Sequence, residues 1–174
     1  MLKRNLARLE QKELLALIRD LYGANKDNQA FLHARFALGD DVLEPYKKAI
    51  CRWVCPDVMR NQQYSISKAK KAISDYQHAI GQPEGIAELS VFYCESCADY
   101  LSFCGMDDDG YFDAMVRMFE QALAIISQLE LPKQEAFVDR LDEVRLRESH
   151  SWCYYVVDEM NTLMDQFRFD ESEL

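Results

Sequence analysis

The stretch that decides the fold class is EGIAELSVFYCESCADYLSFC, which runs from Glu84 to Cys104. Its apolar residues cover nearly every side of a helix, while its few polar residues share one narrow strip. This pattern is typical of a helix that packs against neighbours on several sides. It predicts a central helix that ends at Gly105, a residue type that commonly stops helices.

Apolar residues recur at helical spacing on both sides of this stretch, and no run of strict alternation is long enough to indicate a strand. We therefore predict an all-α protein of about eight amphipathic helices, joined by short turns and packed as antiparallel hairpins. The pattern leaves open a compact bundle or a short helical array, and no repeat of fixed length indicates a solenoid. The predicted helices cover about residues 11–22, 25–38, 41–55, 65–80, 84–104, 107–129, 132–144 and 152–167, after a lead-in near residues 2–9.

The length of 174 residues and a hydrophobic content of 49% predict a single all-helical domain over residues 1–174. The longest candidate loop, residues 57–64, could mark off an N-terminal helical subregion over residues 1–56. The acidic residues 170–174 are expected to form a frayed tail. No apolar stretch approaches the ~20 residues of a membrane span, and no leader pattern opens the chain, so we expect a cytoplasmic protein without membrane contact.

The formal net charge of −10 is unevenly distributed. Residues 84–174 are strongly acidic, whereas residues 47–83 hold seven basic and only two acidic side chains. A negative molecule repels nucleic acid at long range. The basic segment is therefore interpreted either as a surface that neutralises the acidic half or as a docking patch for an acidic protein segment. The candidate partner-binding residues are Lys47, Lys48, Arg52, Lys68, Lys70 and Lys71.

RNA is the weaker interpretation of the same patch. Proteins that bind single-stranded RNA combine arginine with exposed aromatic rings. The patch is rich in lysine instead, and Trp53 and Tyr76 are expected on the apolar faces of their helices.

The six cysteines are interpreted as reduced thiols, mostly buried, in a cytoplasmic protein. Cys94 and Cys97 have the spacing of a redox or zinc motif, but they lie in the middle of the predicted central helix and not at its start. Interior packing is therefore the favoured interpretation. The alternative is a metal-binding or thiol-dependent protein, because two facing helices could bring four thiolates to one zinc ion. Its ligands would be Cys51, Cys55, Cys94 and Cys97.

Other patterns that could carry chemistry are incomplete. The acidic run Asp107–Asp109 before Gly110 lacks two essential ligands of a calcium loop, so helix capping explains it better. The pair Asp75 and His78 occurs once, whereas a di-iron bundle needs two such pairs and two further acids. No nucleophile elbow, zinc-protease or phosphate-binding signature is present. We therefore expect neither a cofactor nor catalytic residues, although an enzyme with an unrecognised site stays open.

Five stretches of the chain carry a resemblance: Glu13–Tyr22, Lys68–Tyr76, Glu88–Cys97, Tyr111–Leu123 and Ser151–Tyr154. In their ordered helix patterns the chain resembles an uncharacterised bacterial all-helical protein family of unknown function. The resemblance spans most of the chain but rests on no catalytic signature. It implies a helical fold and a cytoplasmic location, and it implies no reaction. Together with the charge asymmetry, it leaves a non-enzymatic interaction or scaffold protein as the predicted function.

Overall fold

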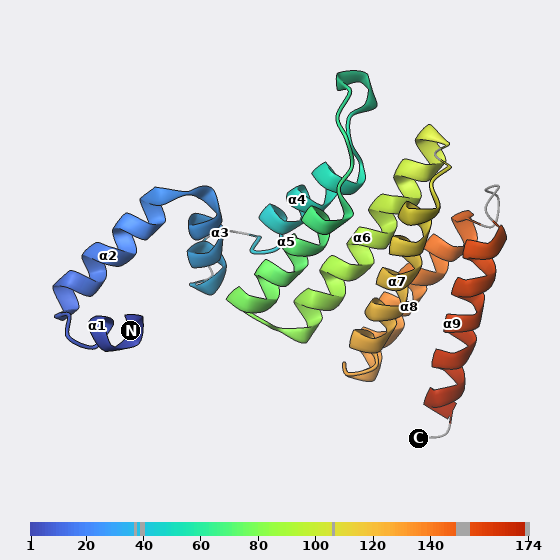
Figure 1. Ribbon diagram of the computed structural model, residues 1–174. Helices are drawn as coiled ribbons and strands as arrows, with labels where there is room; N and C mark the ends of the chain where they lie inside the picture. Colours follow the sequence, from blue (N-terminus) through green and yellow to red (C-terminus); the bar gives the residue numbers. More distant parts are fainter. Residues whose placement is uncertain (37, 39–40, 106, 149–153, 173–174) are drawn as a thin grey trace. The chain divides into compact units, whose positions relative to one another are not determined.

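The structure is a computed structural model that describes residues 1–36, 38, 41–105, 107–148 and 154–172. Within these ranges every regular element is a helix, which confirms the all-α prediction (Figure 1). None of the described helices is both long and apolar enough to cross a bilayer. The chain divides into two compact units, Met1–Val42 and Leu43–Leu174.

The described part of the chain forms nine α-helices and one short 3₁₀ helix, one α-helix more than expected because the lead-in forms a helix of its own. The first unit contains α1 (Leu2–Leu6), α2 (Gln11–Ala24) and α3 (Lys26–Arg35). The second contains α4 (Glu44–Val54), η1 (Val58–Arg60), α5 (Ile66–Ala79), α6 (Pro83–Cys104), α7 (Asp109–Ile126), α8 (Leu131–Glu148) and α9 (Tyr154–Ser172).

The first unit is held by local polar contacts and contains little core. Glu10 and Glu13 form a reciprocal capping box at the start of α2, and the Asn25 side chain accepts a hydrogen bond from the Asn28 N–H at 2.8 Å. The hydroxyl of Tyr22 on α2 lies 2.9 Å from Nε2 of His33 on α3. Among its described side chains only Ala34 is buried. The apolar stripe of α2 therefore stays largely exposed.

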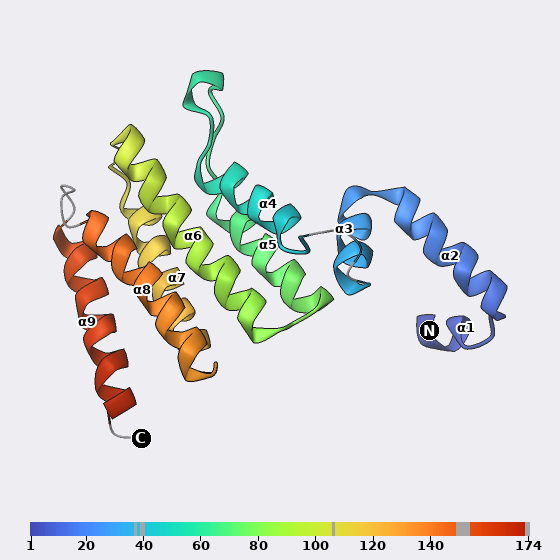
Figure 2. The same ribbon diagram turned by 180° about the vertical axis from the view of Figure 1, so that it is seen from behind.

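In the second unit the hairpins stack into an open array around α6. The helix α6 contacts α4, α5, α7 and α8, whereas α7 and α8 also contact α9. Both views show α6 between the α4–α5 pair and the later helices, with α4 and α9 at opposite ends of the stack (Figures 1 and 2). This arrangement decides between the two predicted architectures in favour of a short helical array.

Helix α6 is the central helix that its composition predicted. Twelve of its residues are buried, and Gly105 ends it in the left-handed region at φ 60°. Its close approach to α5 depends on Gly85, since a Cβ at this position would collide with the ring and hydroxyl of Tyr76. Gly85 therefore fixes the contact between the two helices at the start of α6.

The unit boundary lies between Val42 and Leu43, whereas the expected subregion covered residues 1–56. The helix α4 belongs to the second unit because Tyr46, Ile50 and Val54 are buried and α4 packs on α5 and α6. At the other end, α9 continues to Ser172, so of the predicted tail only residues 173 and 174 lie beyond it, outside the described residues. Trp152, the expected start of the last helix, also falls outside them.

The acidic run before α7 caps the helix, as the sequence predicts. Asp108 is the N-cap residue, and its Oδ1 accepts a hydrogen bond from the backbone N–H of Tyr111 at 3.0 Å. Its Oδ2 accepts one from the hydroxyl of Tyr64 at 2.6 Å. The capping residue thereby also ties the loop before α5 to the start of α7.

Candidate binding surface around Trp53

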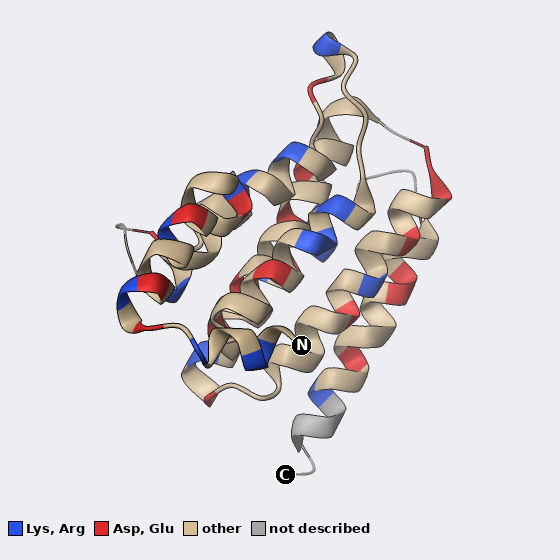
Figure 3. Cartoon of the chain, turned by 60° about the vertical axis from the view of Figure 1, so that its left-hand side comes forward, with Lys and Arg blue, Asp and Glu red and all other residues tan. Residues whose placement is uncertain are grey.

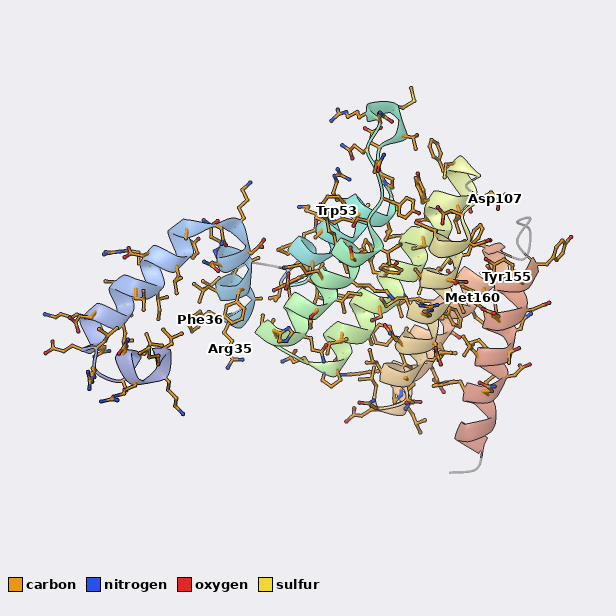
Figure 4. The ribbon with its side chains drawn as sticks, viewed as in Figure 1. Arg35, Phe36, Trp53, Asp107, Tyr155 and Met160 are labelled. Atoms are coloured by element: carbon orange, nitrogen blue, oxygen red, sulfur yellow. The ribbon has the colours of Figure 1, made fainter. Side chains whose placement is uncertain are left out.

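Trp53 lies in the last turn of α4 (Figure 4). Two cations lie over its ring. The guanidinium carbon of Arg52 is 4.5 Å from the ring centroid, and the ammonium of Lys68 on α5 is 3.9 Å from it. Lys68 reaches the ring because the loop between the helices returns to α4, where the N–H of Ser65 donates to the Trp53 carbonyl at 2.9 Å. Arg52, Trp53 and Lys68 are called the Trp53 surface below.

Trp53 is more exposed than the core residues on the apolar face of α4. Its side chain is half-buried, while Tyr76, the other aromatic residue of the segment, is buried in the core. Attraction between each cation and the face of the indole ring stabilises this partly exposed arrangement. The sequence offered no signal for it, because Lys68 comes from another helix.

Three of the other predicted partner-binding residues are occupied by acidic side chains. Lys48 pairs with Glu44 at 3.0 Å and Lys71 with Asp75 at 2.5 Å, each along its own helix. Lys47 donates to Glu88 on α6 at 2.6 Å. Basic and acidic residues alternate in this way along several helices (Figure 3). The structure therefore groups Arg52 and Lys68 and separates them from the remaining lysines.

Lys47 belongs to an ion-pair network that joins three helices. Arg140 on α8 donates two hydrogen bonds of 2.8 Å to Glu95, and it also binds Glu88. Burial alone would raise the pKa of Glu88, but the hydrogen bonds from Arg140 and Lys47 outweigh it and lower this pKa below its ordinary value. Lys47 therefore has a structural partner, which removes it from the candidate binding residues.

Of the five thiols that the structure describes, only the two in the middle of α6 are buried, so the prediction of mostly buried thiols holds for these two. Cys94 and Cys97 are fully buried, and burial, together with the nearby Cys97 thiol, raises the pKa of Cys94 well above its usual range. The half-buried Cys55 donates to the carbonyl of Ser96 at 2.8 Å, and burial raises its pKa as well. Cys51 differs from the expectation because it is exposed. Thiols with raised pKa values are weak nucleophiles at neutral pH.

The four predicted zinc ligands do not form a site among the residues that the structure describes. Within that part of the chain no group of three His, Cys, Asp or Glu side chains could hold a metal ion. Cys153 lies outside the described residues. Next to these thiols, Tyr111 donates from its buried hydroxyl to the Val54 carbonyl at 2.8 Å and so closes the end of α4.

Two grooves open between helices of the second unit, and the sequence indicated neither. The first, of about 430 Å³, lies between α5 and α7 over α6, and Lys70 is its one charged lining residue. The second, also of about 430 Å³, lies between α7 and α9 and is lined by Glu120, Asp158 and Glu159 together with Arg117. Helical spacing in the sequence cannot indicate such grooves, because they depend on how far apart neighbouring helices lie.

Neither protein-family models nor curated proteins nor solved structures gave a match to this chain. The resemblance to an uncharacterised bacterial family therefore stays a prediction.

Proposed function

We propose that this protein is a non-enzymatic, cytoplasmic interaction or scaffold protein that binds an acidic segment of another protein at the Trp53 surface. The observation that carries the proposal is the pair of cations on the Trp53 ring. Arg52 and Lys68 both lie within 4.5 Å of one ring centroid and are exposed. Both groups carry the same charge, and acidic groups bound to them would offset the repulsion between them.

The charges around this surface support an extended acidic partner rather than a single anion. Within the described part of the chain, neither Arg52 nor Lys68 forms an ion pair. One exposed ion pair contributes only about 0.2–1 kcal/mol. A segment with several acidic residues would combine such contacts at Arg52 and Lys68.

RNA fits the same surface less well. A base that stacks on Trp53 would have to displace a cation from the ring. The net charge of −10 also opposes long-range attraction to a polyanion as dense as RNA. A short acidic peptide carries fewer charges, so this repulsion is weaker for it.

The proposal is tested by tryptophan fluorescence with the full chain. The chain has two tryptophans, so a Trp152→Phe background leaves Trp53 as the only reporter. The probe is a synthetic peptide of alternating glutamate and leucine residues, compared with a lysine–leucine peptide and with poly-uridine RNA. We expect the acidic peptide alone to shift the Trp53 emission, with an affinity that falls as salt rises.

Matched variants locate the effect. Replacing Arg52 and Lys68 together by glutamine should weaken acidic-peptide binding at least about tenfold, the loss of one to two charged contacts. Replacing Lys48 and Lys71 by glutamine removes the same charge from residues already paired with Glu44 and Asp75, and it should change the affinity much less. Equal losses in both double variants, or tighter binding of poly-uridine, would contradict the proposal.

A further inference from the structure

The groove between α5 and α7 exists because these helices both pack on α6 without packing closely on each other. Ile86 and Ser90 of α6 form its floor. The Ser90 hydroxyl donates back to the Ile86 carbonyl at 2.8 Å, so the floor presents mainly apolar surface. Ile73 on one wall and Met118 and Ile125 on the other are apolar as well. The groove is thus mainly apolar and open to solvent, and Ser74, Gln77 and Gln121 add polar groups to its walls.

Its length suits a small molecule. The lining residues extend from Lys70 to Gln77 on α5 and from Met118 to Ile125 on α7, and the helical rise converts each range to about 10 Å. A volume of about 430 Å³ lies in the range of small-molecule sites.

Lys70 is the one charged residue in the lining of the groove. Within the described residues it forms no ion pair, whereas its neighbour Lys71 lies on another side of α5 and pairs with Asp75. Since α5 and α7 each run antiparallel to α6 (Figure 1), Lys70, Ser90 and Met118 lie at one end of the groove. The other end, near Ile86 and Ile125, is apolar with Gln77 at its edge.

We propose that this groove binds a free amphipathic monoanion: a single unbranched apolar chain that ends in a carboxylate. The carboxylate binds the Lys70 ammonium, and the chain lies over Ser90 and Ile86 towards Ile125. This combination follows from the lining, because an apolar channel with a cation at one end complements an anionic head and an apolar tail. The site is separate from the Trp53 surface, so either proposal can fail without the other.

The test is isothermal titration calorimetry of the full chain with decanoate, below the concentration at which it forms micelles. We expect binding with a negative heat-capacity change, since apolar surface is buried. Lys70→Gln should weaken decanoate binding about tenfold or more, the cost of losing a charged hydrogen bond. Ala124→Trp fills the groove from its α7 wall and should abolish binding. Decanol, which lacks the charge, should bind the wild type and Lys70→Gln equally.

Two control variants test whether binding depends on Lys70 specifically. Lys71→Gln removes the adjacent lysine outside the groove and should leave the affinity for decanoate unchanged, as should the double glutamine variant at Arg52 and Lys68. The proposal is overturned if decanoate does not bind the wild type, or if Lys70→Gln or Ala124→Trp, folded by circular dichroism, binds it normally. The protein could instead bind phosphatidylglycerol vesicles through Lys70 and fail to bind decanoate. That result would assign the groove to lipid surfaces and would contradict the proposal of a free ligand.

Discussion

The two units carry the same kind of amphipathic helix but use it differently. In Met1–Val42 the stripe of α2 is clear in the sequence, yet Leu17, Ile18 and Leu21 are all exposed and no residue of the helix is buried. In Leu43–Leu174 the stripe of α7 is of similar strength, and ten of its residues are buried. Periodicity therefore predicts which face of a helix is apolar, but not whether another element covers it.

The difference has an energetic cause. A chain of about 40 residues rarely buries enough surface to offset its conformational entropy. The first unit has local capping and polar contacts but almost no interior, whereas in the second unit α4, α5, α7 and α8 all pack on α6. Stability should therefore be concentrated in the second unit, and the following predictions test this distribution.

The largest effect is expected in the centre of the second unit. Phe119 on α7 is fully buried, so Phe119→Ala should lower the free energy of unfolding by about 3–5 kcal/mol through lost burial and a cavity. Urea denaturation followed by far-UV circular dichroism measures this change. A loss below about 1 kcal/mol would show that the second unit lacks the packed core described.

A smaller effect is expected where Tyr111 closes the end of α4. Tyr111→Phe keeps the ring but leaves the buried Val54 carbonyl without its donor, at a cost of about 1–2 kcal/mol. Urea denaturation again gives the value. Tyr154→Phe, which changes an exposed hydroxyl, is the matched control and should leave stability unchanged. A similar loss in both variants would contradict the role given to the Tyr111 hydroxyl.

The ion-pair network should make the second unit sensitive to acid. The folded state lowers the pKa of Glu88, so its contribution to stability is present above the unfolded pKa of about 4.3 and is lost as pH falls through the lower folded value. Glu88→Gln should cost about 1 kcal/mol at neutral pH and flatten the loss of stability between about pH 5 and pH 3. If Glu88→Gln leaves the pH dependence of the free energy of unfolding unchanged, Glu88 does not contribute to the acid sensitivity of the protein.

The smallest effect is expected in the first unit. Leu21 on α2 is 49% exposed, so Leu21→Ala should change the free energy of unfolding by no more than about 0.5 kcal/mol. The same denaturation experiment compares it directly with Phe119→Ala. A decrease of about 2 kcal/mol or more in the free energy of unfolding is the cost expected for a buried leucine. Such a decrease would show that the apolar stripe of α2 is covered in solution and that the two units do not differ in this respect.

Local features could be predicted from the sequence because neighbouring residues determine them. Gly105 ends α6 and Asp108 caps α7 as the chain order implies. Features that join distant elements could not be predicted. Trp53 receives Lys68 from the next helix, and the groove beside Lys70 depends on the distance between α5 and α7. The basic segment could be recognised from its composition. Which of its cations lie close together depends on how α4 and α5 pack as a hairpin.

The open array also sets the order in which the molecule loosens. In a linear stack each hairpin is held by its neighbours, so α6 is supported on both sides and α9 on one. Local unfolding should start from α9 and spread inwards, and backbone amides of α9 should exchange with deuterium before those of α6. A ligand in the groove beside α6 would then slow exchange in the slowest part of the protein rather than in α9.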